Sequence, residues 1–178
     1  MQVILSGIEC LRQHIKQMNE HPGSYRPSRC PSCGKAGLWY HGRYLRFPGR
    51  SPNDHHLNPI SIPRFICPEC SKTCSVLPEC MPARRWYLWA VQHLVLSSIL
   101  AGRSIRFVSR QSVLARSTVR RWRRWLDDCF VACASGLRSR FAEFGRYQTV
   151  ELFWLAVWRV MSLAKAMLYC HQYGITVP

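Results

Sequence analysis

Two pairs of cysteines are the residues whose types and spacing point most directly to a chemistry. The sequence reads Cys-Pro-Ser-Cys-Gly at 30–34 and Cys-Pro-Glu-Cys at 67–70. Each Cys-x2-Cys turn places two thiolates within reach of one ion, and two such turns complete a tetrahedral site with Zn–S bonds of about 2.3 Å. Such a closed site has no open position for water, so it holds shape rather than catalyses. The pattern predicts one structural zinc ion bound by Cys30, Cys33, Cys67 and Cys70.

Alternatives to this ligand set are open at the level of sequence. The two pairs could instead form two disulfides or stay free thiols. Competing ligands are His41, His55, His56, Cys74 and Cys80. We expect His41 in a turn or as a phosphate contact, His55 and His56 in solvent, and these cysteines as small buried packing residues. The start of the chain lacks a positive region and Glu9 interrupts its apolar run, so we expect no secretory signal. That favours a reducing cytoplasm, where paired cysteines indicate metal.

The segments around the cysteines predict a small β structure. Trp39 to Phe47 and Ile60 to Cys67 have strand character, and the loop 49–59 between them is rich in turn-forming residues. Residues 71–78 look like a last strand, closed by Pro78. We therefore predict a four-cysteine zinc ribbon over 25–80, preceded at 1–24 by a helix (3–19) and a linker.

Charge moves the expected partner towards nucleic acid. The 178 residues contain 25 Lys+Arg against 9 Asp+Glu, a balance of +16, and nearly all the positive charge is arginine. The arginine fork suits phosphate groups and guanine edges. An anionic membrane surface is the competing explanation.

Residues 81–127 predict a helical DNA-binding domain. A helix is expected over Ala83–Leu100, and Arg84 and Arg85 at its start conflict with the helix dipole. A bound phosphate would relieve this conflict; the alternative is that both arginines are simply solvated. Two short helices, joined near 112–115, fit the stretch 104–126. Their expected core residues are Ile105, Val108, Leu114, Val119 and Trp122. The outward residues of the second helix, which suit a major groove, are Ser117, Thr118, Arg120, Arg121, Arg123 and Arg124.

The last part of the chain, 128–178, predicts a helical extension. Residues 127–147 continue as helix, with Cys129 and Cys133 on one face as packing residues. A long, mostly apolar helix is expected over 150–173, with Trp154 and Trp158 as candidate interface anchors. Arg159 and Lys165 lie within its apolar stretch and disfavour a membrane span. We expect this helix to make a homodimer or to bind a separate subunit.

Several motifs together resemble a known family. These are Cys-Pro-x-Cys-Gly, His-Gly-x-Tyr at 41–44, Ile-Pro-Arg-Phe-x-Cys-Pro-x-Cys at 62–70 and Thr-x-Ser at 73–75, followed by a helix-turn-helix pattern. The chain is similar, over about 25–126, to the N-terminal module of bacterial insertion-sequence transposases and their short zinc-ribbon accessory proteins. The resemblance implies that the four cysteines bind zinc. It also implies that Arg116, Ser117, Thr118, Arg120 and Arg121 begin a DNA-contacting recognition helix.

Two positions depart from that family, and we expect the chain to lack the family's catalytic domain. Val113 stands where the turn usually has glycine, and Cys74 where phenylalanine is usual. Strand transfer by such transposases is expected to need three carboxylates and two metal ions. Beyond residue 126 the acids are Asp127, Asp128, Glu143 and Glu151, all in apparent helices. Asp127 and Asp128 are better interpreted as a helix-face pair or as partners of nearby arginines.

We therefore predict an α+β protein: a small zinc ribbon, then a mainly helical helix-turn-helix domain with a long C-terminal helix. It would bind double-stranded DNA sequence-specifically as a cytoplasmic, nucleoid-associated transposase accessory or truncated transposase, without enzymatic activity or a small-molecule substrate. A transcriptional repressor using the same helix-turn-helix is the alternative. Three further alternatives remain: an enzyme with an unrecognised acidic site, an RNA-binding protein and a membrane-associated protein.

Overall fold

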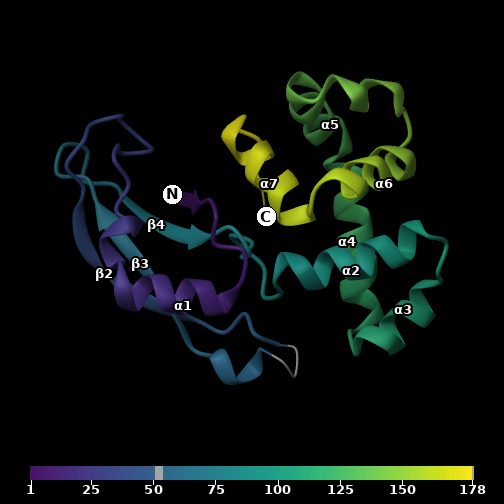
Figure 1. Cartoon of the computed structure of the whole chain (residues 1–178), viewed down its shortest axis with the longest axis horizontal. Helices are drawn as coiled ribbons and strands as arrows, with labels where there is room; N and C mark the ends of the chain where they lie inside the picture. Colours follow the sequence, from purple (N-terminus) through teal and green to yellow (C-terminus); the bar gives the residue numbers. More distant parts are fainter. Residues whose placement is uncertain (51–53, 178) are drawn as a thin grey trace. The chain divides into compact units, whose positions relative to one another are not determined.

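The computed structural model describes residues 1–50 and 54–177, which form two compact units, 1–88 and 89–177. The expected α+β class is confirmed: the described residues contain one four-stranded sheet and seven α-helices (Figure 1). The sheet and helix α1 lie in the first unit, and the other six helices lie in the second. Most of the expected loop at 49–59 is described, but its residues 51–53 lie outside the described residues.

The sheet has the order β1-β4-β3-β2. Its strands are β1 (Gln2–Leu5), β2 (Trp39–Arg46), β3 (Ile60–Ile66) and β4 (Thr73–Pro78). β1 pairs in parallel with β4, and the other neighbours are antiparallel. The expected helix over 3–19 is therefore wrong in its first part, because Gln2–Leu5 finds a ladder partner in β4. Helix α1 begins only at Leu11 and ends at Glu20.

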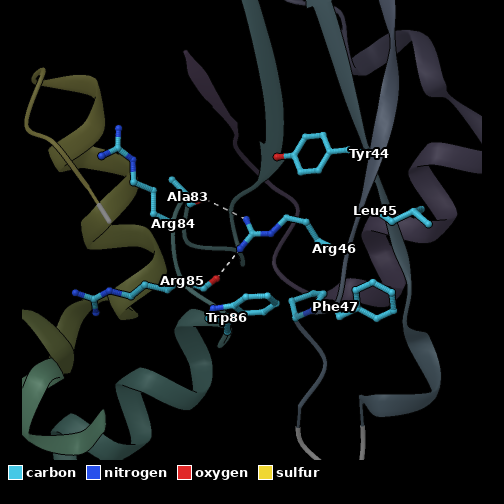
Figure 2. Close-up of a pocket in the computed structure, with 9 residues that line it drawn as sticks. Tyr44, Leu45, Arg46, Phe47, Ala83, Arg84, Arg85 and Trp86 are labelled. Carbon is cyan, nitrogen blue, oxygen red and sulfur yellow. Dashed lines mark hydrogen bonds between the residues drawn. The ribbon is translucent and has the colours of Figure 1, made fainter. Parts of the chain in front are cut away.

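The segment 81–88 is held on the first unit instead of starting a helix. The Arg46 guanidinium on β2 donates hydrogen bonds to the backbone carbonyls of Pro82, Ala83 and Arg85, the last two of which are drawn in Figure 2. These bonds fix the carbonyls in an irregular conformation. The expected helix Ala83–Leu100 is thus wrong at its start: α2 spans Trp89–Leu100.

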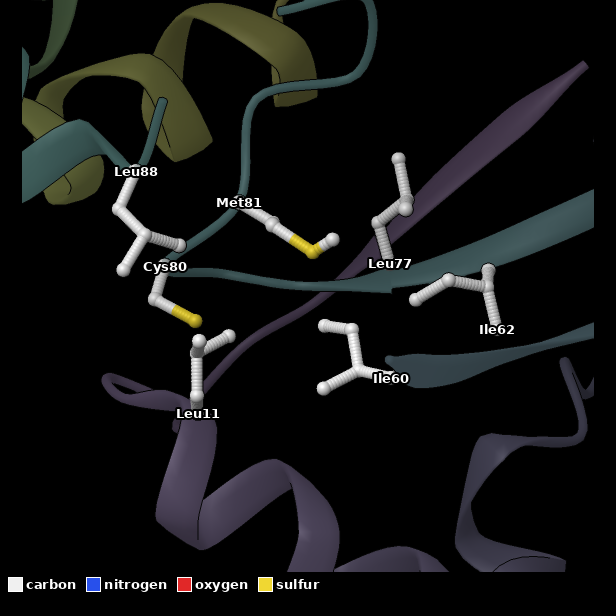
Figure 3. Close-up of a cluster of buried hydrophobic side chains, with 7 residues drawn as sticks. All are labelled: Leu11, Ile60, Ile62, Leu77, Cys80, Met81 and Leu88. Carbon is white, nitrogen blue, oxygen red and sulfur yellow. The ribbon is translucent and has the colours of Figure 1, made fainter. Parts of the chain in front are cut away.

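The core of the first unit has two clusters. The first joins α1, β3, β4 and the 81–88 segment (Figure 3), and consists of Leu11, Ile60, Ile62, Leu77, Cys80, Met81 and Leu88. The second surrounds the cysteine pairs and consists of Tyr25, Cys30, Leu38, Phe65, Cys67, Cys74 and Val76. Tyr25 ends the short 3-10 helix η1 (Pro22–Tyr25), and its hydroxyl lies 2.6 Å from His14 Nδ1 on α1. This contact links α1 to the second cluster.

The second unit is helical throughout its regular structure. After α2 come α3 (Ile105–Ser112), α4 (Arg116–Asp128), α5 (Phe130–Arg140), η3 (Ala142–Arg146), α6 (Val150–Val160) and α7 (Leu163–Gln172). The expected continuous helix over 127–147 is wrong, since it divides into the end of α4, then α5 and η3. Short helices crossing one another give this unit a core without a sheet.

The single long helix expected over 150–173 is also wrong. α6 ends at Val160, and Ser162 caps a new helix by accepting a hydrogen bond from the Lys165 N–H at 3.2 Å. The two helices meet at 102°. Trp154 is fully buried within its own unit, against Phe153 and Trp158, so it is not an exposed interface anchor. No single helix among the described residues is long and apolar enough to cross a membrane; only the bent pair α6 and α7 together passes such a test.

A short turn joins α3 to α4 where the sequence suggested a break. The expected core residues Val108, Leu114, Val119 and Trp122 are buried, and Ile105 is half-buried. Ser104 caps α3, and the Ser109 hydroxyl donates to the Leu114 carbonyl across the turn at 2.6 Å. Val113 has φ 55° and ψ 32°, the left-handed conformation in which a β-branched residue is strained. The turn thus keeps the backbone of a glycine turn without the glycine.

Val113→Gly should raise the free energy of unfolding by about 1 kcal/mol, because glycine adopts this conformation without a steric cost. No packing is lost, since Val113 is 91% exposed. Urea unfolding measures the change. The matched control is Val131→Gly at an exposed position inside α5, which should lower stability. Equal destabilisation by both changes would contradict the account.

The second unit should lose stability as pH falls, through His93 on α2. His93 Nδ1 accepts a hydrogen bond from the Leu163 N–H at 2.9 Å, at the first residue of α7. Burial lowers the pKa of His93 from 6.5. The unfolded chain therefore binds this proton more readily. The contribution to stability is complete above pH 6.5 and is lost as pH falls through the lower folded pKa.

Urea unfolding between about pH 5 and about pH 8 tests this, with His93→Gln as the comparison because glutamine can accept the bond without titrating. The variant should show a weaker pH dependence than the natural chain. An unchanged pH dependence in His93→Gln would rule His93 out as its source.

Candidate metal centre and cationic surfaces

The structure brings together the four cysteines that the sequence singled out. The sulfurs of Cys30, Cys33, Cys67 and Cys70 all lie within 4.8 Å of one another. The Sγ–Sγ distances are 3.7 Å for Cys30–Cys70 and 3.6 Å for Cys33–Cys67. Sulfurs at the corners of a tetrahedron with metal–sulfur bonds of about 2.3 Å are about 3.8 Å apart. The donor set and its spacing therefore fit one tetrahedral metal ion.

The two cysteine turns have the same backbone geometry. The Cys30 N–H donates to the Lys35 carbonyl at 2.7 Å, and the Gly34 N–H donates to the Cys30 carbonyl at 2.9 Å. In the second turn the Cys67 N–H donates to the Lys72 carbonyl at 3.0 Å, and the Ser71 N–H to the Cys67 carbonyl at 2.9 Å. The residue after each second cysteine is left-handed, with φ 74° at Gly34 and 54° at Ser71. One local design thus presents both thiol pairs.

Backbone donors prepare the first thiol for ionisation. The N–H groups of Cys33 and Ser32 point at the Cys30 sulfur and lower the pKa of its thiol to about 6. At Cys33 a hydrogen bond from the Lys35 backbone lowers the thiol pKa, but desolvation and the neighbouring sulfurs outweigh it and raise that pKa to about 12. Adjacent thiolates repel one another, and a cation between them removes this conflict.

The competing ligands do not join the cluster. His55 and His56 are exposed in the short 3-10 helix η2 (His55–Leu57), and His41 is exposed on β2. Cys74 and Cys80 are buried packing residues, and burial raises the pKa of both thiols, to about 12 at Cys80. The ten cysteines, all of them within the described residues, form no disulfide, so the alternative of two disulfides is not what the structure contains.

A stripe of polar side chains runs along α4, opposite its buried side. Val119, Trp122 and Leu126 are buried, spaced three and four residues apart. Ser117, Arg120, Arg121 and Arg124 share the exposed face at positions i, i+3, i+4 and i+7, with Arg116 exposed and Thr118 half-buried beside them. The structure therefore presents most of the predicted contact residues on one helical surface.

Arg123 has a different position from its neighbours. Its guanidinium pairs with Asp127 at 2.9 Å and with Glu151 on α6. The Arg123 hydrogen bond also lowers the pKa of the Glu151 carboxyl. The expected pairing of Asp127 with a nearby arginine is thus present, and Arg123 ties α4 to α6.

Arg84 and Arg85 lie in the irregular 81–88 segment, before the first residue of α2. The argument that they conflict with a helix dipole therefore fails. Both line a depression of about 480 Å³ between β2 and this segment, together with Arg46, Phe47 and Trp86 (Figure 2). Arg50 lies over the exposed ring of Trp86, 4.8 Å from its centroid.

Two features were missed by sequence reasoning. Cys133 on α5 contacts both Cys129 and Cys170, and hydrogen bonds from their thiols lower the pKa of Cys133, although Cys170 lies far along the chain. A second pocket gathers Gln2, Tyr44, Arg64, Thr73 and Ser75 beside Arg84. The residues of this second pocket come together through the pairing of the strands, and no local sequence motif predicts that pairing.

The chain matches one family model, the domain of unknown function DUF6431, over residues 30–122. The chain belongs to this family. The matched region begins at the first metal-site cysteine and ends within α4, so it includes all four cysteines and the α3–α4 turn. No curated protein and no solved structure matches the chain.

Cys67→Ser should abolish binding of the metal, because three thiolates and a weak hydroxyl ligand do not replace the closed four-sulfur site. Cys74→Ser is the matched control: Cys74 is buried in the same cluster of side chains but lies outside the four-sulfur group. Elemental analysis of purified protein should give one ion per chain for the natural protein and for Cys74→Ser, and none for Cys67→Ser. Loss of metal in Cys74→Ser but not in Cys67→Ser would show that Cys74, and not Cys67, is the ligand.

Proposed function

We propose that this protein binds double-stranded DNA sequence-specifically, with one structural zinc ion in the four-cysteine site. Four thiolates at tetrahedral spacing are the ligand set typical of structural zinc. On this proposal β2, β3 and β4 with their two cysteine turns are a zinc ribbon. The ion holds the unit in shape and takes no part in chemistry, because all four coordination positions are filled by protein.

The observation that carries the DNA proposal is the exposed stripe on α4. We interpret α3, the turn at Val113 and α4 as a helix-turn-helix with α4 as the recognition helix. α4 has 13 residues and is about 20 Å long, a length that the major groove accommodates. Ser117 and Thr118 at its start would reach base edges, and Arg120, Arg121 and Arg124 would reach bases or phosphates. Arg123 supports this surface by holding α4 to α6.

The balance of +16 supports a polyanionic partner. We further propose that the protein is an accessory or truncated transposase of a bacterial mobile element, acting in the nucleoid and lacking catalytic activity. The motifs at 30–44 and 62–75 support that relationship. Exposed Leu152 and Val160 on α6 offer contacts to a second copy or to a separate transposition subunit. A repressor would use the same helix. Selection of bound genomic sites distinguishes them, since an accessory protein would select element ends and a repressor would select promoters.

Arg120→Ala with Arg121→Ala should weaken duplex binding about 10- to 100-fold and reduce the slope of log affinity against log salt by about 2, because two phosphate contacts are lost. Fluorescence anisotropy across a salt series measures both quantities.

The matched control is Arg12→Ala with Arg26→Ala, which removes the same charge from exposed positions outside α4. It should leave the affinity within about twofold, an amount set by long-range screening alone. Equal weakening by the two double variants would show that net charge, and not α4, carries the binding.

A further inference from the structure

A second pocket lies on the sheet of the first unit, and none of the four metal-site cysteines lines it. It has a volume of about 320 Å³, at the small end of the range for ligand pockets. Its lining residues are Met1, Gln2, Tyr44, Arg64, Thr73, Ser75 and Arg84. None of these described residues is acidic, and five of them carry a side-chain N–H or O–H donor in addition to the charged arginine of β3.

Strand register builds this pocket. Ser75 on β4 is paired with Gln2 on β1 and with Arg64 on β3, so three side chains stand in a row on one face of the sheet. Thr73 lies two residues before Ser75 on the same face of β4. Tyr44 adds its side chain from β2, opposite Ile62, which is two residues from Arg64. All four strands therefore contribute to one polar surface.

The arginine of β3 is partly oriented before any ligand arrives. Arg64 Nη2 donates to the Thr73 hydroxyl at 3.2 Å, and Arg64 is only half-exposed. Arg84, on the 81–88 segment that Arg46 holds in place, also lines this pocket. Two guanidinium groups with hydroxyl donors on a rigid sheet suit an anion with several oxygen acceptors.

We propose that this pocket binds a phosphate group. Arg64 and Arg84 supply charge-assisted hydrogen bonds to its oxygens, and Ser75, Thr73 and Gln2 supply neutral ones. The phosphate can belong to a nucleic-acid backbone or to a free phosphate or nucleotide. The backbone source rests on the proposed function, whereas the phosphate chemistry does not.

Nuclear magnetic resonance titration of the metal-loaded full chain with inorganic phosphate tests the proposal, with sodium chloride at equal ionic strength as reference. The backbone amides of Arg64 and Ser75 should shift saturably in the natural chain. Arg64→Gln should weaken phosphate binding about tenfold or more, the cost of removing a hydrogen bond to a charged group.

Arg43→Gln is the matched control: Arg43 precedes Tyr44 on β2, so it points to the opposite face of the sheet and removes the same charge. It should leave phosphate binding within about twofold. If Arg64→Gln disturbs the fold, Arg84→Gln, at an exposed position outside the sheet, should give the same loss. Shifts that do not saturate, or an equal loss in Arg43→Gln, would overturn the proposal.

Duplex DNA then identifies the source. If Arg64→Gln weakens both inorganic phosphate and duplex binding, the site contacts the nucleic-acid backbone. If it weakens inorganic phosphate alone, the ligand is a free phosphate or nucleotide. Saturable phosphate binding in a chain that does not bind duplex would support this pocket while contradicting the proposed function.

Discussion

The first unit depends on the contact among four sulfurs. Cys30 and Cys33 precede β2, and Cys67 and Cys70 lie between β3 and β4, so one bound ion would join the ends of three strands. Cys30 and Cys67 are also buried in the cluster that contains Leu38 and Phe65. A sheet of four short strands covered by one helix has a small apolar core, and domains of this kind usually gain stability from a metal.

The positions of the cysteine turns also affect the rest of the first unit, because they fix how β4 pairs with β3. The cysteine turn after β3 sets which residues of β4 face β3, and this places Ser75 beside Arg64. Arg46 on β2 then holds the carbonyls of the 81–88 segment, which covers the cluster of Leu77 and Met81. Arg64 and Arg46 are therefore each held by hydrogen bonds to neighbouring parts of the first unit, which an arginine on an unpaired loop would lack. The second unit relies instead on helix packing and on the ion pairs of Arg123.

The parts of the structure that follow from local pattern could be predicted from sequence. The four cysteines carry their own spacing rule, and the buried and exposed sides of α4 follow from its helical period. Ser104 marks the start of α3. The break between α3 and α4 falls at residues 113–115, within the predicted join at 112–115. In the second unit the features predicted from local pattern therefore include α4, with its cluster of arginines.

Features that depend on distant partners could not be predicted. Gln2–Leu5 pairs with β4, which lies far along the chain. The β-branched Val3 and Ile4 favour a strand, but they are too short a signal to show this pairing. The division of 150–173 comes at Ser162, which caps α7. The sequence predicts a helix at Arg84 and Arg85 because the contact that prevents it comes from Arg46, far away in the chain. A contact of this kind leaves no local pattern. The phosphate pocket was missed because its lining comes from four strands and a loop.

The most direct test of the central proposal is hydrogen–deuterium exchange of the zinc-loaded chain with and without duplex DNA. The account predicts that duplex slows exchange across the turn and α4, residues 113–124, while the cysteine turns exchange slowly in both states because the ion already holds them. Unchanged exchange across 113–124 at saturating duplex, or protection confined to other helices, would contradict the assignment of α4 as the DNA-reading helix.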